Sequence, residues 1–298
     1  MDFRPIRLED KSLIEHYVRA WGLINSSYTF TNLFIWGHSD NILIAEEQNV
    51  LYIMFCFGGR INLLAPIPES TQYDYEKAVN IGADYLKSIG KPVRFAYASE
   101  SIYEAFSTQC HGAHFELDRG NCDYIYNSAD LITLSGKHFH AKRNFINRFH
   151  SIYPDYSFVR ITPDMEAECA SVFSEWLHNK NVLLPGMEGE GPAITRLIRN
   201  MDTLSVFGGG IKVRGRLIAA SFGELITPKI GLVHIEKAND LYSGIYPMIN
   251  QSFSNAFFGH TELINREEDM DIEGLRKSKL SYHPKMLIEK YTVSFEEI

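Results

Sequence analysis

The sequence lacks long apolar runs, has few cysteines and carries no excess of positive charge. Its longest apolar run, residues 50–57, has the length of a strand and falls well short of the roughly 18 residues of a membrane span. The first ten residues, MDFRPIRLED, lack the apolar core of a signal peptide. The four cysteines are scattered without metal-like spacing, which favours a reduced, cytoplasmic protein. A net charge of −8 argues against a general nucleic-acid binder, so a polyanion would need a local basic patch.

Common catalytic motifs are missing as well. The sequence contains no G-x-S-x-G and no P-loop. His111 and His114 lie near each other in a predicted loop, but no matching ligands accompany them, and no metal is predicted. The 45% of hydrophobic and 13% of aromatic residues are instead those of a well-packed globular protein.

Two halves of the chain share one order of predicted elements: two helices, three meandering strands, then helix, strand, helix and closing strand. Their turns align at an offset of about 166–169 residues, taken from Val50 to Arg216 and from Ile61 to Ile230. Such a repeat is far longer than the roughly 20–50 residues of a solenoid. No linker rich in proline, glycine or serine separates the halves, so we expect tightly packed domains at residues 1–130 and 131–298. A chance agreement between two domains of mixed α and β structure is the alternative.

The most charged stretch, residues 265–284, reads NREEDMDIEGLRKSKLSYHP. Acids open it and bases close it, which suits the dipole of a short helix predicted at residues 271–279. An apolar stripe is expected from Ile272, Leu275 and Leu280. Lys279 falls on the face of Ile272 and Leu275, where a cation needs a partner or a wet cleft. Asp269 or Asp271 could supply that partner, and an ordinary surface helix is the simpler interpretation.

The most basic stretch, residues 135–150, reads SGKHFHAKRNFINRFH. On a helical wheel its apolar arc contains Lys142, with Arg143 at the border. One interpretation is an amphipathic helix between two domains, with Lys142 extending its charge to water. The other is a phosphate-binding platform, because a cation among aromatic residues needs an anion, either a substrate phosphate or an acid near Asp269.

These two stretches carry a family resemblance. DMDIEGLRKSKLSYHP resembles the terminal motif of the family named for the C-terminal domain of phosphatidylglycerol lysyltransferase, and GKHFHAKRN resembles the beginning of that family's second domain. The chain is more loosely similar to Fem-type aminoacyl transferases. The resemblance implies an α/β (α+β) fold of two GNAT-like domains in tandem, each a mixed central sheet flanked by helices. It also implies that the C-terminal domain is the active one and that the N-terminal domain is non-catalytic.

Further site residues follow from this resemblance. In GNAT-like folds the strand corresponding to residues 229–236 borders the acyl-transfer site. His234 and Glu236 lie two apart on it and so share a face, and Glu236 could accept a proton from the attacking group. Ordinary half-buried polar residues are the alternative. Residues 239–249, NDLYSGIYPMI, stand where an acetyl-CoA enzyme has its glycine-rich pyrophosphate loop, but only Gly244 is present.

We therefore predict an acyltransferase that moves an aminoacyl group from aminoacyl-tRNA to an amine or hydroxyl of a small-molecule or peptide acceptor. Lys279 would lie near the developing charge and Glu236 would act as base. The substrate side would comprise Lys142, Arg143, Arg276, Asp269, His234 and Gly244. A CoA-dependent N-acetyltransferase using acetyl-CoA and an inactive GNAT-like binding module are the alternatives. Since the transmembrane half of membrane-bound lysyltransferases is missing, no lipid acceptor is implied. The oligomeric state stays open.

Overall fold

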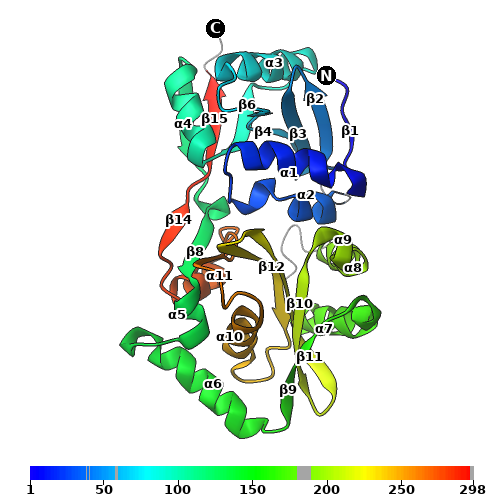
Figure 1. Ribbon diagram of the computed structural model, residues 1–298, viewed down its shortest axis with the longest axis vertical. Helices are drawn as coiled ribbons and strands as arrows, with labels where there is room; N and C mark the ends of the chain where they lie inside the picture. Colours follow the sequence, from blue (N-terminus) through cyan, green and yellow to red (C-terminus); the bar gives the residue numbers. More distant parts are fainter. Residues whose placement is uncertain (38, 40, 58–59, 180–188, 296–298) are drawn as a thin grey trace. The chain divides into compact units, whose positions relative to one another are not determined.

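The computed structural model describes residues 1–37, 39, 41–57, 60–179 and 189–295 of the chain. The chain forms two compact units (Figure 1). The first unit comprises Met1–Asp123, Glu268–Leu275 and Leu287–Ile298, and the second comprises Tyr124–Glu267 and Arg276–Met286. Within the described residues, no helix has both the length and the apolar character needed to cross a membrane.

The first unit is built on a mixed sheet. In spatial order its strands are β1 (Arg4–Pro5), β2 (Leu43–Glu47), β3 (Val50–Phe57), β4 (Arg60–Leu64), β6 (Arg94–Ala98), β15 (Tyr291–Phe295) and β7 (Ala113–Leu117), with β5 (Ile67–Pro68) paired to β3. The pair β4 and β6 is parallel, and its neighbours are antiparallel. The helices of this unit are α1 (Lys11–Ala20), α2 (Phe30–Trp36), α3 (Tyr75–Ser88) and α4 (Glu100–Gln109).

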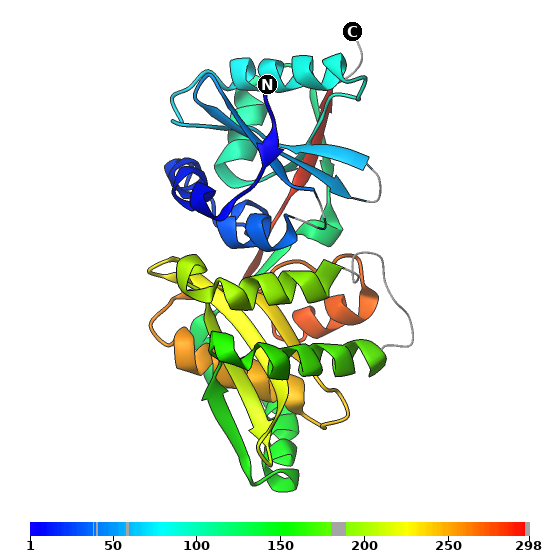
Figure 2. The ribbon, with the colours of Figure 1, turned by 90° about the vertical axis from the view of Figure 1, so that its right-hand side faces the viewer.

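The second unit is built on a similar mixed sheet. Its strands follow in the order β9 (Tyr156–Arg160), β10 (Phe207–Val213), β11 (Arg216–Thr227), β12 (Ile230–Ala238), β13 (Leu263–Asn265), β8 (Asp123–Asn127) and β14 (Met286–Ile288). Helix α7 (Glu166–Asn179) packs on one face of the sheet, beside α8 (Glu190–Arg199), and α10 (Ile245–Phe257) packs on the other (Figures 1 and 2). The remaining helices are α5 (Ser128–Thr133), α6 (His140–Ile152), α9 (Met201–Leu204) and α11 (Glu273–Leu280).

The two sheets repeat one pattern, as the turn offsets predict. Strands β3 and β11 occupy the same place in their sheets, and in each sheet the parallel pair comes next along the order. The turns before β3 and β11 also share their geometry. Gln48 and Asn49 have φ of 51° and 62°, and Arg214 and Gly215 have φ of 51° and 77°. Two consecutive positive φ values are the mark of a type I′ hairpin turn, whose twist suits the flanking strands.

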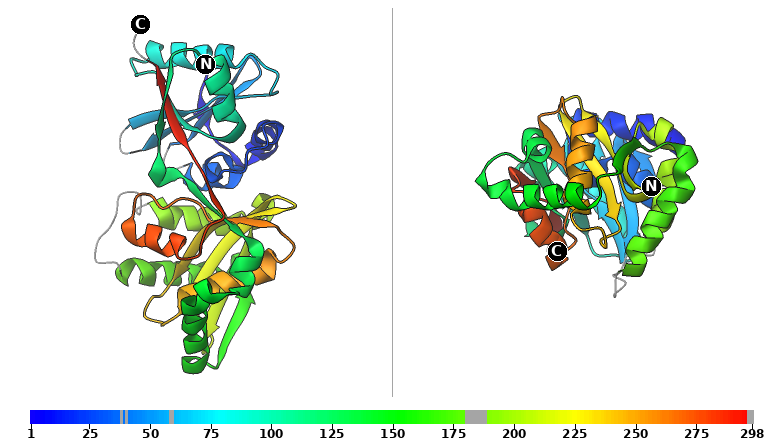
Figure 3. Two further views of the ribbon diagram at one scale, coloured as in Figure 1. Left: turned by 90° about the vertical axis from the view of Figure 1, so that its left-hand side faces the viewer. Right: turned by 90° about the horizontal axis from the view of Figure 1, so that it is seen from below.

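The closing strands of the two halves are exchanged. Strand β8 ends the first half of the sequence but pairs with β13 in the second sheet, whereas β15 ends the second half but lies between β6 and β7 (Figure 3). Residues 287–295 therefore belong with the first unit, although the sequence analysis assigns them to residues 131–298. Alternation of apolar residues identifies a strand, but it does not determine which sheet the strand joins.

Helix α11 differs from its prediction in detail. It begins at Glu273 and ends at Leu280, and the Leu280 side chain is 45% exposed. The predicted apolar stripe is therefore wrong at Leu280. Lys279, in contrast, is buried with only 8% exposure, as its spacing from Ile272 and Leu275 predicts. The inward face of this short helix thus contains the cation and excludes the last leucine.

Candidate functional site

A hollow of about 220 Å³ opens in the second unit. Its wall comes from α6, from the loop between β12 and α10, from the first turn of α10 and from the end of α11 with the residues that follow. The lining residues are Lys142, Phe145, Asp240, Tyr242, Gly244, Ile245, Tyr246, Pro247, Ser278 and Tyr282. Two of the predicted site residues, Lys142 and Gly244, therefore meet in one hollow although they lie about a hundred residues apart in the sequence.

Lys142 contributes a cation to this hollow. Helix α6 places its Nζ 3.9 Å from the centroid of the Tyr282 ring, in a cation–π contact. Burial, together with the neighbouring charge of Arg266, lowers the pKa of Lys142 to about 8 against the opposing effect of Glu236. Lys142 is therefore mostly charged at neutral pH, yet it releases its proton more readily than an ordinary lysine.

Beside Tyr282 lies an ion pair that is largely shielded from solvent. Arg266 follows directly after β13 and donates from Nη2 to Glu236 Oε1 over 3.0 Å. Its guanidinium also stacks 4.9 Å from the Tyr282 ring and 5.8 Å from the Tyr126 ring. Burial disfavours the charge of Arg266, but Glu236 and the surrounding hydroxyls outweigh that effect and raise its pKa. Glu236, the predicted base, is thus engaged with Arg266, and it is not part of the wall of the hollow.

His234 forms a second and separate cluster. Its Nδ1 lies 3.1 Å from Glu267 Oε1 and its Nε2 lies 3.0 Å from Glu224 Oε1. Burial opposes the ring's positive charge, but the hydrogen bonds to the two carboxylates outweigh it and raise the pKa of His234 to about 9. A register shift in the pairing of β11 with β12 falls at this residue, because Phe222 faces Ile235 and Gly223 faces Val233. His234 and Glu236 therefore have different partners, although they are two apart.

Lys279 holds the backbone that follows β13. Its Nζ donates to the carbonyl oxygens of Arg266 and, over 3.2 Å, of Glu267. The Tyr126 hydroxyl in turn donates to the Lys279 carbonyl oxygen over 2.8 Å. Lys279 is not among the residues that line the hollow. It contacts the backbone of the segment that carries Arg266.

The other predicted residues have diverse environments. Arg143 donates from Nη1 to the carbonyl oxygens of Leu134 and, over 2.7 Å, of Gly136, and so ties the segment before α6. Arg276 is half-buried in α11. Asp269 lies in the first unit, where its buried carboxylate is 3.2 Å from Arg119 Nη1. The structure therefore places only Lys142 and Gly244 of the predicted set directly at the hollow.

Gly244 is required by packing. Its φ is +88°, and a Cβ there would lie 2.3 Å from the Phe145 carbonyl oxygen of α6. The helix that follows is poorly supplied with free backbone donors, because the Ile245 N–H bonds to the Tyr242 carbonyl over 3.1 Å and Pro247 has no N–H. A diphosphate needs several such donors at a helix start. This terminus therefore fits the pyrophosphate of CoA poorly.

Most residues in the wall of the hollow are not among the predicted site residues. Asp240, Tyr242, Tyr246 and Tyr282 belong to it, yet single tyrosines and one loop carboxylate are common everywhere. The sequence does point to this neighbourhood, because Tyr242 and Tyr246 lie within residues 239–249, the stretch that corresponds to the pyrophosphate loop of acetyl-CoA enzymes. Tyr282 stands just beyond the charged helix, within the motif that carries the family resemblance.

Two units with matching mixed sheets, each flanked by helices, define a tandem GNAT-like fold. The chain belongs to the family described as phosphatidylglycerol lysyltransferase, C-terminal, which matches residues 21–294.

Solved structures agree with this assignment. A conserved protein of unknown function from Bacteroides thetaiotaomicron is 31% identical, with a TM-score of 0.88 over 99% of this chain and 100% of that one. The C-terminal domain of a putative lysylphosphatidylglycerol synthetase from Agrobacterium fabrum is 14% identical, with a TM-score of 0.68 over 96% and 92%. FemX is 8% identical, with a TM-score of 0.59 over 99% and 97%. The last two likenesses establish the fold.

Proposed function

We propose that this protein transfers an aminoacyl group from a charged tRNA to an amine or hydroxyl of a small-molecule or peptide acceptor, and that the reaction takes place in the hollow of the second unit. The observation that carries the proposal is the Lys142 ammonium, held at the wall of a small hollow among tyrosine rings. The family and the fold supply the reaction class. The poor fit of the α10 start to a diphosphate favours a tRNA donor over acetyl-CoA.

The chemistry follows from the ester that joins an amino acid to tRNA. The nitrogen or oxygen of the acceptor attacks the ester carbonyl carbon, and the carbonyl oxygen becomes an oxyanion. The bond to the ribose oxygen then breaks, the acceptor loses a proton and the ribose oxygen gains one. A fixed cation beside the oxyanion stabilises the transition state. We assign this role to Lys142 because it lines the hollow, and its pKa of about 8 also suits proton donation to the leaving ribose oxygen.

The neighbouring charged residues would position this cation. Arg266 and Glu236 form the ion pair beside Tyr282, and Lys279 fixes the backbone of Arg266. In this proposal Lys279 therefore acts through the wall of the hollow and does not touch the reacting atoms. Arg143 and Arg276 would contact tRNA phosphates, because both lie in the cationic stretches that resemble the family.

A panel of labelled aminoacyl-tRNAs, incubated with the protein and with amine and hydroxyl acceptors, tests the proposal. We expect label to move to an acceptor from at least one of these tRNAs. An acetyl-CoA titration in a thermal melt is the companion measurement, because a bound ligand raises the melting temperature. A rise with acetyl-CoA and no transfer from any tRNA would favour the N-acetyltransferase. Binding of tRNA without transfer would indicate an inactive binding module.

A further inference from the structure

The hollow carries a carboxylate as well as a cation. Asp240 lies in the loop between β12 and α10, is exposed, and lines the hollow. The Asn179 side-chain amide donates to Asp240 Oδ1 over 3.0 Å. The partner that the structure shows for this carboxylate is thus an uncharged side chain. A neutral amide therefore fixes the carboxylate while its charge stays available to a ligand.

Asp240 is held by a buried neighbour. The Asn239 side chain donates to Glu175 Oε2 over 2.7 Å and accepts from the Leu241 N–H over 3.1 Å. Its backbone N–H bonds to the Ile218 carbonyl on β11 over 2.9 Å. Glu175 lies on α7, so the loop is fastened both to that helix and to the sheet. A carboxylate held this way loses little freedom when a ligand binds, which favours affinity.

The walls around Asp240 are aromatic. Tyr242, Tyr246 and Tyr282 line the same hollow, together with the half-exposed ring of Phe145. The contact between Lys142 and Tyr282 shows that a ring face in this hollow accepts an ammonium group. Aromatic faces combined with one carboxylate are the chemistry that recognises an organic ammonium ion.

We propose that Asp240 binds the free α-ammonium group of the aminoacyl donor, while Lys142 faces the acyl oxygen. This inference rests on the proposed function and specifies its substrate class: acyl groups that carry an unblocked α-amine. The two charges give the hollow a polarity that matches such a group, because the ammonium is attracted to Asp240 and repelled by Lys142. A hollow of about 220 Å³ is smaller than the roughly 300–1,000 Å³ of pockets for drug-sized ligands, in keeping with a single aminoacyl group.

Binding of amino acid amides to the full chain tests this without tRNA. The probes are the amides of alanine, serine, leucine and lysine, each paired with its α-N-acetyl form, measured by calorimetry and thermal shift. We expect at least one free amide to bind about 10- to 100-fold more tightly than its acetylated form, the range of one charged hydrogen bond. Equal binding of both forms, or no binding of any free amide, would overturn the inference.

Variants test whether Asp240 causes the preference for the free amide over its acetylated form. In Asp240→Asn the preference for the free amide should disappear, because the amide side chain keeps the shape and removes the charge. Since added bulk would reject the acetyl form equally in both proteins, a clash cannot mimic this result. Asp202→Asn, which changes an exposed carboxylate of α9, is the matched control and should keep the preference. A preference that survives in Asp240→Asn would also overturn the inference.

The transfer reaction gives an independent comparison. An aminoacyl-tRNA that serves as donor should lose activity when its α-amine is acetylated, and this loss should be smaller in Asp240→Asn. If no aminoacyl-tRNA serves as donor, the proposed function fails, and the amide titrations still decide whether Asp240 binds an ammonium group. If transfer occurs equally from acetylated donors, the function stands and the inference about Asp240 fails.

Discussion

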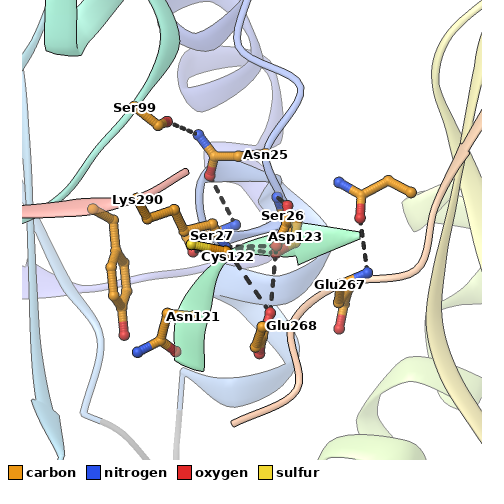
Figure 4. A network of polar contacts seen from close by, with 12 residues as sticks. Asn25, Ser26, Ser27, Ser99, Asn121, Cys122, Asp123, Glu267, Glu268 and Lys290 are labelled. Carbon is orange, nitrogen blue, oxygen red and sulfur yellow. Dashed lines mark hydrogen bonds and ion pairs between the residues drawn. The ribbon is translucent and has the colours of Figure 1, made fainter. Parts of the chain in front are cut away.

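Lys290 Nζ lies 2.7 Å from Asp123 Oδ1, and both side chains are completely buried in the first unit (Figure 4). The Ser26 and Ser27 hydroxyls lie 3.1 and 2.8 Å from the same Nζ. The Ser26 backbone N–H also donates to Asp123 Oδ2 over 2.6 Å. Asp123 opens β8 and Lys290 directly precedes β15, so this pair fixes both exchanged strands at their starts.

Lys290→Met should therefore destabilise the protein by about 3–5 kcal/mol, because it leaves the Asp123 carboxylate buried without its cation. Chemical denaturation measures the effect. The double variant Lys290→Met, Asp123→Asn should recover part of the loss, since no buried charge remains. Lys229→Met removes a surface cation paired with Glu262 and should change stability little. A Lys290→Met protein as stable as wild type would show that the pair contributes nothing to the fold.

Local features of the fold were predictable from the sequence, whereas its long-range partners were not. The turns at Gln48-Asn49 and at Arg214-Gly215 follow from short-range chemistry, and so they align the two sheets correctly. Strand β15 joins the first sheet because of pairing with β6 and β7, which lie more than 170 residues earlier. No local pattern contains that information.

The same limit applies to the site. Burial of Lys279 follows from its helical spacing, but its ammonium group donates to two backbone carbonyls, which no side-chain pattern identifies. Lys142 was correctly placed in the apolar arc of its helix, and the structure adds the ring of Tyr282 that contacts it. The sequence predicts phosphate binding at Gly244. In the structure this glycine packs directly against the Phe145 backbone, which leaves no room for a side chain. A glycine needed for close packing looks the same in a sequence as one needed for a ligand.

The cluster of His234, Glu224 and Glu267 should make stability depend on pH. The folded pKa of His234 is raised to about 9, against about 6.5 in the unfolded chain. Its contribution of about 3 kcal/mol is therefore complete below about pH 6.5, decreases as the pH rises and is lost above about pH 9. Unfolding free energies measured from pH 6 to 10 should show this decrease in wild type and not in His234→Gln. Identical pH profiles for the two proteins would contradict the assignment.

Gly244→Ala should weaken the packing of α6 on α10. The new Cβ would approach the Phe145 carbonyl oxygen far inside normal contact, and the backbone would keep an unfavourable φ of +88°. Gly215→Ala is the matched control, because φ is +77° there and nothing lies within 4 Å of the new Cβ. The control should cost about 1–2 kcal/mol for its φ alone, and Gly244→Ala clearly more. Thermal melts of both variants measure the difference. Equal losses of stability would show that α6 can shift away from the new Cβ without destabilising the protein.

Substitution of Lys142 should mainly affect turnover, whereas substitution of Lys279 should mainly affect stability. Lys142→Met removes a cation from the hollow, so turnover in the transfer assay should fall by roughly 10²–10³, the scale of losing one oxyanion donor. Stability should change little, because the charge is already disfavoured by burial and methionine keeps most of the volume. In wild type, turnover should also decrease as the pH rises above about 8 and Lys142 loses its proton.

Lys279→Met instead removes a donor from two backbone carbonyls, of which that of Glu267 keeps the Tyr124 N–H as a partner. It should destabilise the protein by about 1–3 kcal/mol, the cost of leaving one acceptor unsatisfied at Arg266, and should lower turnover less than Lys142→Met does. Melting temperature and transfer rate, measured on the same two variants, separate the roles. A stable Lys279→Met protein with a 10²-fold or greater loss of turnover would return Lys279 to the reacting centre and leave Lys142 as part of the wall.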